Sequence, residues 1–191
     1  MKNDYSYEKE ELSEESRMQR KAEIKKSETQ GWIISLAAAV VIALLLRFFV
    51  FEFIRVDGSS MEPTLYTNEY VFMEKVTYWF GSPQYGDIVI CSYPQRTETF
   101  VKRVIGTEGD TIEVRDGTLY INGTADTKYY SSYINYEMAP TIVPEDTVFV
   151  MGDNRNASMD STNSSIGPLP YNMILGEAVF VIWPFDRLHG L

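Results

Sequence analysis

The sequence predicts a mainly β domain preceded by one apolar helix that is long enough to cross a membrane. Three observations predict it: an apolar run near the N-terminus, short segments rich in Val, Ile, Tyr and Phe after that run, and turn signals between those segments. A length of 191 residues suits one modest domain with additions. We therefore predict a cytoplasmic tail over residues 1–30, a membrane anchor over residues 31–54 and an extracytoplasmic domain over residues 55–191.

Composition excludes several classes of function. The chain has 17 Lys and Arg against 27 Asp and Glu, a formal net charge of -10, which argues against nucleic acid as a partner. The single cysteine, Cys91, excludes an internal disulfide and a Cys-rich zinc site, and we expect it to be a small buried residue in a strand. The single histidine, His189, lies almost at the C-terminus, so a hydrolase here is expected to use a lysine or a carboxylate as its base. No metal and no cofactor are expected.

The first 30 residues are polar and are expected to form a disordered tail or a frayed helix, because they cannot bury a core. Five basic residues precede the apolar run, namely Arg17, Arg20, Lys21, Lys25 and Lys26. Few basic residues flank the other end of the run. The positive-inside rule therefore predicts a cytoplasmic N-terminus and an outside location for the residues that follow position 57.

The apolar run extends from Trp32 to Leu46 with only Ser35 polar, and FFVF follows Arg47. A helix over residues 32–51 would be about 30 Å long, which matches the hydrocarbon thickness of a bilayer. A buried core helix would have a polar face, and a cleavable signal peptide would have small residues after its apolar run. The sequence has neither feature, so we predict an uncleaved anchor.

Seven segments beyond the anchor are predicted to be strands, and none shows a long apolar period of 3.6 residues. They are residues 70–72, 87–93, 100–105, 111–115, 118–121, 147–151 and 178–183. Asp116-Gly117, between two alternating segments, predicts a two-residue hairpin turn. Residues 110–146 are expected to be a β and loop insertion, in which the tyrosines of residues 124–143 cover one side of the sheet.

Two segments carry candidate catalytic residues. Residues 58–65 read GSSMEPTL, which is either an ordinary turn or a turn that presents a nucleophilic serine. In VKRVIGTEGD, residues 101–110, strand alternation places Lys102 on the face of Phe100 and Arg103 on the opposite face. Apolar neighbours would desolvate Lys102 and lower its pKa toward neutrality, whereas a lysine that extends into water would keep its ordinary pKa.

A third segment, residues 151–161, reads MGDNRNASMDS and predicts a loop dense in hydrogen-bonding groups directly after a strand. A calcium loop of the EF-hand type would end in a bidentate Glu and lie between two helices. The sequence has neither feature here, so it does not favour calcium binding.

The anchor and the three ordered motifs SMEPTL, KRVIGTEGD and GDNRNASMDS together resemble the type I signal peptidases, the S26 family of serine–lysine proteases. The similarity is to the single-span branch typical of Gram-positive bacteria and runs from the anchor to Pro184. It implies a signal-peptidase or LexA-like β catalytic core with a small β insertion. It also implies a membrane-bound endopeptidase that removes signal peptides from exported preproteins at the outer surface of the plasma membrane.

The resemblance assigns roles to residues at matching motif positions. Ser60 would be the nucleophile, Lys102 would be the general base, and the backbone N–H of Ser60 would be the main donor to the oxyanion. Ser158 would hydrogen-bond the lysine amine. Four residues would brace the loop that carries this serine, namely Asp153, Asn154, Arg155 and Asp160.

The expected partners are a signal peptide and the lipid bilayer. By analogy with the family, shallow apolar pockets would accept small residues at the first and third positions before the cut. Their lining would come from Val56, Met61, Leu65, Phe100 and Val101. The aromatic residues 78–80 are expected either to enter the membrane interface or to pack in the core.

Two positions depart from the family's pattern. Gly58 stands where two-span relatives have a serine, so a side-chain donor to the oxyanion is absent, as is usual in the Gram-positive branch. Thr162 stands where the last motif normally has an arginine that pairs with the aspartate equivalent to Asp160. The departure concerns this brace and leaves the roles of Ser60 and Lys102 unchanged.

Three alternatives to the housekeeping enzyme differ in features that the sequence shows. A LexA-like self-cleaving repressor would carry a DNA-binding helical domain where this chain has an anchor. A catalytically dead pilus-assembly module would lack the serine or the lysine, and the sequence contains both. A specialised paralogue with few clients, such as pilins, stays open.

Overall fold

The computed structural model describes residues 18–19, 29–47, 49–129 and 132–191. The chain forms two compact units that divide after Arg47. The predicted disorder of the tail and the basic residues that support a cytoplasmic N-terminus lie outside the described residues. The orientation of the chain in a membrane therefore stays a prediction.

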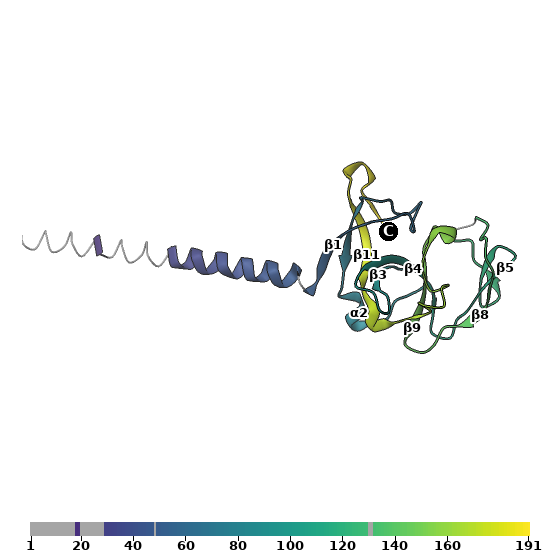
Figure 1. Ribbon diagram of the computed structural model, residues 1–191. Coiled ribbons are helices and arrows are strands. Elements are labelled where there is room, and N and C mark those ends of the chain that lie inside the picture. Colours follow the sequence, from purple (N-terminus) through teal and green to yellow (C-terminus); the bar gives the residue numbers. More distant parts are fainter. Residues whose placement is uncertain (1–17, 20–28, 48, 130–131) are drawn as a thin grey trace, which may run out of the picture. The chain divides into compact units, whose positions relative to one another are not determined.

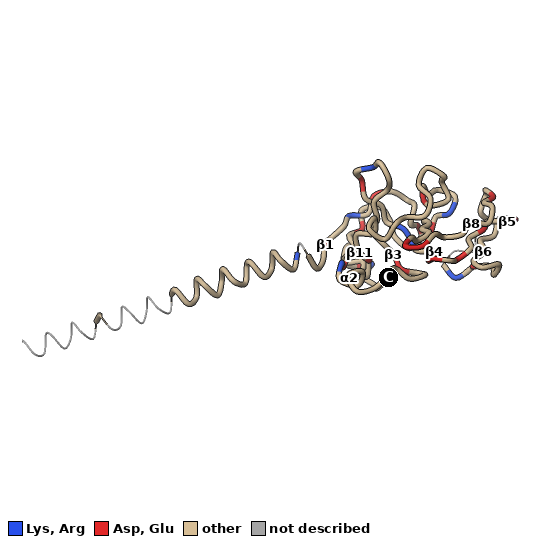
Figure 2. Tube along the Cα trace, turned by 90° about the horizontal axis from the view of Figure 1, so that it is seen from below, with Lys and Arg blue, Asp and Glu red and all other residues tan. Residues whose placement is uncertain are grey.

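The first unit contains an apolar helix, Thr29–Arg47, of 19 residues. It carries no charged residue except the arginine at its C-terminal end (Figure 2). At 1.5 Å per residue it is about 28 Å long, which is enough to cross the hydrocarbon of a bilayer. The helix is shorter than the predicted residues 32–51, because Phe51–Arg55 forms strand β1 and hydrogen-bonds to a neighbouring strand instead.

The second unit is built on an eight-stranded antiparallel sheet (Figure 1). Seven strands follow the order β1-β2-β11-β3-β4-β9-β10, and β12 pairs with β11. Their bounds are β1 (Phe51–Arg55), β2 (Tyr70–Glu74), β3 (Ile88–Ser92), β4 (Thr99–Thr107), β9 (Thr147–Met151), β10 (Leu169–Pro170), β11 (Ile174–Trp183) and β12 (His189–Gly190). All seven predicted strands are present across the two sheets, and β4 lies between β3 and β9.

A smaller sheet has the order β7-β6-β5-β8 and lies on the side of the domain away from β1 (Figure 1). Its strands are β5 (Thr111–Arg115), β6 (Thr118–Ile121), β7 (Thr124–Ala125) and β8 (Met138–Ile142). The predicted hairpin turn is confirmed, since φ is 50° at Asp116 and 73° at Gly117. From the sequence, residues 124–143 are expected to be rich in loops and β8 is not predicted; this strand contains Pro140 and lies at the edge of the sheet, where a proline is tolerated.

Four short helices connect these strands. They are α2 (Thr77–Phe80), η1 (Arg155–Ala157), η2 (Tyr171–Met173) and η3 (Phe185–Arg187). In α2, Tyr78 packs against the core and its hydroxyl donates to Asp87 Oδ2 at 2.9 Å, whereas Trp79 and Phe80 are exposed. The aromatic segment is thus divided between core and surface.

Three clusters of buried side chains form the core. One, which includes Val56, Met61, Leu65, Ile88 and Ile90, lies on one face of β3. A second lies on the other face and contains Val89, Cys91, Tyr93, Val104 and Val150. The third, which includes Ile105, Ile112, Val114 and Phe149, joins the two sheets. Because β3 is covered on both faces, the prediction that Cys91 is a small buried strand residue is confirmed, and burial raises the pKa of its thiol to about 12.

Candidate active site

A tight turn presents Ser60 at the edge of the core. The backbone N–H groups of Thr64 and Leu65 both donate to Met61 O, at 2.9 and 3.0 Å. Met61 and Leu65 are buried and anchor the turn in the first core cluster. Gly58, before the serine, has φ +97°, a conformation that side chains other than glycine's disfavour. Local backbone bonds and two apolar anchors therefore fix the serine's position.

Lys102 extends from the middle of β4 to this serine. Its Nζ lies 2.7 Å from Ser60 Oγ and donates to Val101 O at 2.9 Å. The side chain is 2% exposed, and in the register of the sheet Lys102 lies opposite Val89, a member of the second core cluster. Burial lowers the pKa of the Lys102 amine below its ordinary value, and the charges of Asp160, Cys91 and Asp153 only partly oppose this effect. A neutral amine at this distance can accept the serine's proton.

The loop after β9 packs against the serine's backbone. Asn154 N–H donates to Ser60 O at 3.0 Å, and Asn154 Nδ2 donates to Ser59 O at 3.1 Å. Gly152 lies so close that a Cβ there would be 2.4 Å from both Ser60 O and Ser158 Oγ. These two bonds tie the loop after β9 to the backbone of Ser59 and Ser60.

Ser158 lies beside these groups, but its predicted hydrogen bond is absent. Its Oγ is buried and has no hydrogen-bond partner among the described residues. The Lys102 amine instead contacts Ser60 Oγ and Val101 O. Ser158 therefore lies next to the site without a hydrogen bond to the Lys102 amine.

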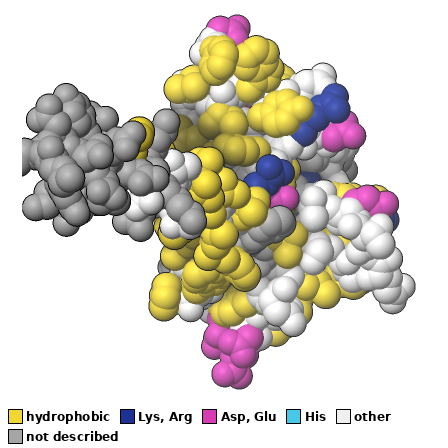
Figure 3. Space-filling view, turned by 90° about the vertical axis from the view of Figure 1, so that its left-hand side faces the viewer, with side chains coloured by type: hydrophobic (Ala, Val, Ile, Leu, Met, Phe, Trp, Pro, Cys, Tyr) yellow, Lys and Arg dark blue, Asp and Glu magenta, His cyan; other side chains and the backbone are white. Residues whose placement is uncertain are grey.

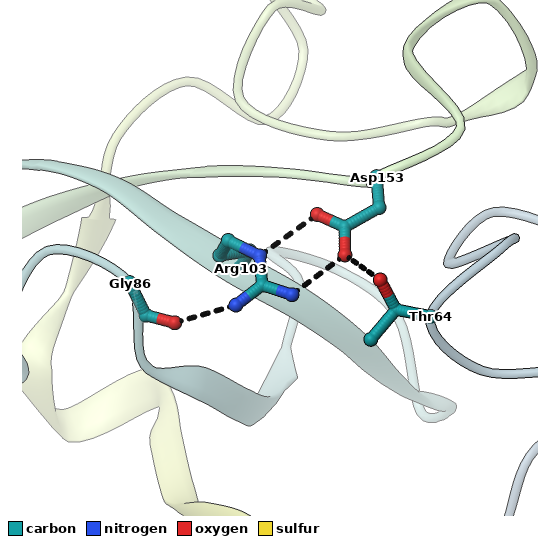
Figure 4. A network of polar contacts seen from close by, with 4 residues as sticks. All are labelled: Thr64, Gly86, Arg103 and Asp153. Atoms are coloured by element: carbon teal, nitrogen blue, oxygen red, sulfur yellow. Dashed lines mark hydrogen bonds and ion pairs between the residues drawn. The ribbon is translucent and has the colours of Figure 1, made fainter. Parts of the chain in front are cut away.

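An ion pair links the loop to β4 (Figure 4). Arg103, next to the lysine, donates from Nε to Asp153 Oδ1 at 2.9 Å and from Nη2 to Asp153 Oδ2 at 2.7 Å. Its Nη1 donates to Gly86 O at 2.8 Å, and Thr64 Oγ1 donates to Asp153 Oδ2 at 2.5 Å. Asp153 thus joins the serine's turn to the strand of the lysine. Strand alternation placed Arg103 on the face opposite Lys102 and did not predict its pair with Asp153, although a charged residue within an apolar strand is a signal of a buried pair.

Asp160 is held by hydrogen bonds that do not need the family's arginine. Asp160 Oδ1 accepts from Thr162 Oγ1 at 2.7 Å and from Thr162 N at 3.2 Å, and Oδ2 accepts from Gly152 N at 2.9 Å. The threonine replaces the family's arginine as the partner of the carboxylate. Arg155, the other predicted brace, is 2% exposed, and burial lowers the pKa of its guanidinium although nearby Asp153 raises it.

A cleft of about 260 Å³ opens beside the serine and the lysine. Four of the five predicted substrate residues line it, namely Val56, Met61, Phe100 and Val101. The prediction for Leu65 is wrong, because this side chain is fully buried in the core beneath the turn. Polar residues that sequence reasoning missed also line the cleft: Arg55, Asp57, Glu98 and Thr99. In the part of the chain that the structure describes, no three His, Cys, Asp or Glu residues gather as metal ligands would.

Comparison with known proteins assigns this site to a family. Residues 29–183 match the family described as signal peptidase, peptidase S26. A signal peptidase I of Bacillus licheniformis is 39% identical over 175 residues, which cover 86% of this chain and 94% of that protein. The chain belongs to the signal peptidase I family.

Two further relatives are a plant protein and a bacterial protein of known structure. A probable thylakoidal processing peptidase 2 of Arabidopsis thaliana is 43% identical over 162 residues, which cover 80% of this chain and 44% of the plant protein. The crystal structure of a signal peptidase I from Enterococcus faecalis V583 is 30% identical with a TM-score of 0.44, and the match covers 51% of this chain and 97% of that one.

Membership of the signal peptidase I family confirms the resemblance that the motifs indicated. The chain is a serine peptidase, and signal peptidases I act on exported preproteins that carry signal peptides. Members of the family are membrane-associated, and Thr29–Arg47 is the candidate span among the described residues. The predicted mainly β fold is confirmed by the eight-stranded and four-stranded sheets.

Proposed function

We propose that this signal peptidase removes signal peptides from exported preproteins with Ser60 as nucleophile and Lys102 as general base. The observation that carries the proposal is the 2.7 Å distance between Lys102 Nζ and Ser60 Oγ, at a lysine that is 2% exposed. A serine hydroxyl is a weak nucleophile until a base accepts its proton, and an exposed lysine is protonated at neutral pH. Burial lowers the pKa of the Lys102 amine and so favours its neutral form.

The reaction divides into two proton-coupled steps. Lys102 Nζ takes the Ser60 proton as Oγ attacks the carbonyl carbon before the cut, and the backbone N–H of Ser60 stabilises the oxyanion. The ammonium then gives its proton to the departing amine, which leaves an ester on the serine. In the second step the amine takes a proton from a water that attacks the ester carbonyl, and the resulting ammonium returns this proton to Ser60 Oγ as the acyl group leaves. A carboxylate beside the lysine would keep the ammonium protonated, so the pairing of Asp153 with Arg103 favours the reaction.

The cleft supports the substrate assignment. Its volume of about 260 Å³ is slightly below the range of about 300–1,000 Å³ that is usual for ligand sites, which suits a peptide with small side chains at the cut. Val56, Phe100 and Val101 supply apolar contacts, and a bulky substrate side chain would have to displace them.

An aromatic patch supports the bilayer as the second partner. We define it as Phe51, Phe53, Phe72, Phe180 and Trp183. The rings of the first three contact one another at 5.4 to 5.9 Å, and Phe180 is the cross-strand partner of Phe72. Phe53 and Phe180 are half exposed, and hydrophobic side chains gather on one face of the molecule (Figure 3). A patch of exposed aromatic side chains favours contact with a membrane interface.

The dyad is tested by cleavage of a purified preprotein. Ser60→Ala and Lys102→Ala should each reduce kcat/KM to near background, and the double variant should be little slower than either single one, because both groups serve one step. His189→Ala, on exposed β12, is the control and should cleave at the wild-type rate. Cleavage by Lys102→Ala at near the wild-type rate would disprove the mechanism.

The outward-facing location needs a separate test. Protease added to intact protoplasts should degrade the domain from residue 55 onward and spare an epitope tag fused to the N-terminus. Protection of the domain would place it in the cytoplasm and would remove the assignment of exported preproteins as substrates.

A further inference from the structure

The guanidinium of Arg103 is held on three sides by residues of the signal peptidase core. Its Nε and Nη2 donate to Asp153, and its Nη1 donates to Gly86 O at 2.8 Å. These bonds lie in the plane of the guanidinium and use its edges (Figure 4). The flat face of the group is left for a contact of another kind.

Tyr129 supplies that contact. Its ring centroid lies 4.0 Å from Arg103 Cζ, within the range of a strong cation–π interaction. Tyr129 belongs to the segment between β7 and β8, which comes from the smaller sheet. A residue of the insertion therefore covers the arginine that stands next to Lys102.

Further contacts hold the tyrosine in place. Its ring lies 5.6 Å from the ring of Tyr85, and a Cβ on Gly86 would be 2.3 Å from its hydroxyl. Lys128 Nζ lies 4.6 Å from the same ring, and Tyr85 Oη donates to Asp126 Oδ1 at 2.8 Å. The segment that carries the tyrosine is thus packed against the turn before β3.

The contacts continue from the tyrosine to the nucleophile. Arg103 holds Asp153, Asp153 accepts from Thr64 in the turn that carries Ser60, and the next residue of the loop donates to Ser60 O at 3.0 Å. We propose that Tyr129 is a positioning residue of the proposed Ser60–Lys102 site, which holds Arg103 flat against Asp153 and so fixes the serine relative to the lysine.

The pairing of Arg103 with Asp153 also affects the pKa of Lys102. The charged and titratable groups around Lys102 are Cys91 from β3, Asp153 and Asp160 from the loop after β9, and Arg103 and Arg155 near those carboxylates. Arg55, Asp57 and Glu98 line the same cleft as the lysine. When Arg103 pairs closely with Asp153, the carboxylate's field at the amine is reduced. A loosened Arg103 would leave that field uncompensated, which raises the pKa of Lys102 and lowers the fraction of neutral amine at a given pH.

The test compares two substitutions in the full-length enzyme in detergent, with a fluorogenic signal-peptide substrate. Tyr129→Phe keeps the ring and should keep kcat and KM within about twofold of wild type. Tyr129→Leu keeps an apolar side chain without the ring and should reduce kcat by about five- to thirtyfold with little change in KM. In the same variant the acid limb of the kcat/KM profile should move to higher pH.

Tyr133→Leu is the matched control, because Tyr133 lies in the same insertion and is exposed. It should change neither kcat nor the pH profile. A loss of kcat in Tyr129→Leu with an unmoved acid limb, or an equal loss in Tyr129→Phe, would overturn the inference. If Tyr129→Leu equals wild type while Ser60→Ala is inactive, only this inference fails, whereas activity in Ser60→Ala refutes the proposed function itself.

Discussion

Gly152 packs against Ser158 so closely that a Cβ on the glycine would lie 2.4 Å from the serine's Oγ and 2.6 Å from its Cβ. The same Cβ would lie 2.4 Å from Ser60 O. The φ angle of Gly152 is not in the left-handed region, so this position requires glycine because of space and not because of backbone conformation. The close approach lets the loop after β9 lie directly against the backbone of the nucleophile.

Gly152→Ala should therefore displace Ser60 from the lysine. We expect kcat to fall by about a hundredfold, since a misplacement of 1 Å at a reacting group has such effects. Overpacking should also cost about 1–3 kcal/mol of unfolding free energy. Gly167→Ala is the control, because no atom lies within 4 Å of its Cβ position and only backbone strain at φ +64° is added. An active Gly152→Ala enzyme with a wild-type melting temperature would contradict this packing.

Lys102→Met should stabilise the fold while it abolishes activity. The pKa of Lys102 is lower in the folded chain than the ordinary value of 10.5, so between these two pKa values the unfolded chain binds more protons and wild-type stability rises with pH. The gain in Tm from the methionine, about 2–4 °C for each kcal/mol recovered, should thus be largest at neutral and acid pH. It should shrink as pH approaches 10.5. Calorimetry across this range checks both the sign and the window.

The pair formed by Asp160 and Thr162 predicts the effect of restoring the family's arginine. Thr162→Arg removes the hydroxyl that donates to Asp160 Oδ1 at 2.7 Å and should not raise the melting temperature. Thr162→Val should lose about 1–2 kcal/mol because it leaves the carboxylate with one fewer donor, and Thr162→Ser should keep most of the stability. A clear gain in melting temperature for Thr162→Arg would show that the threonine is the weaker partner.

Leu65 and Phe100 should separate stability from specificity. Leu65→Ala removes a fully buried side chain and should cost about 2–5 kcal/mol of unfolding free energy, with the cleavage site unchanged.

Phe100 lines the cleft and stacks on Tyr93 with centroids 4.1 Å apart. Phe100→Ala should enlarge the cleft. For substrates with a larger residue at the cut, kcat/KM should rise by about tenfold relative to kcat/KM for substrates with alanine there. Sequencing the products and measuring urea unfolding for both variants distinguishes the two roles.

The sequence by itself determined the apolar helix, the strands with strong alternation, the Asp116-Gly117 turn and the three motifs. These features are local, because hydrophobic period and turn chemistry are properties of neighbouring residues. Local signals also have limits. They extended the helix beyond Arg47, where pairing of β1 with β2 decides the conformation, and they did not predict β8 because its place at a sheet edge is not visible in the sequence.

Only the tertiary structure decided which side chains meet. In the folded chain Leu65 packs in the core and not in the cleft, and Thr162 donates a hydrogen bond to Asp160. The tertiary structure also brought Tyr129 of the insertion onto Arg103. Ser60 and Lys102 are 42 positions apart, and their 2.7 Å contact exists because β4 and the turn before β2 converge on one core. Chain order does not specify such contacts, since they arise from the way the sheets curve and pack, which depends on all the buried side chains together.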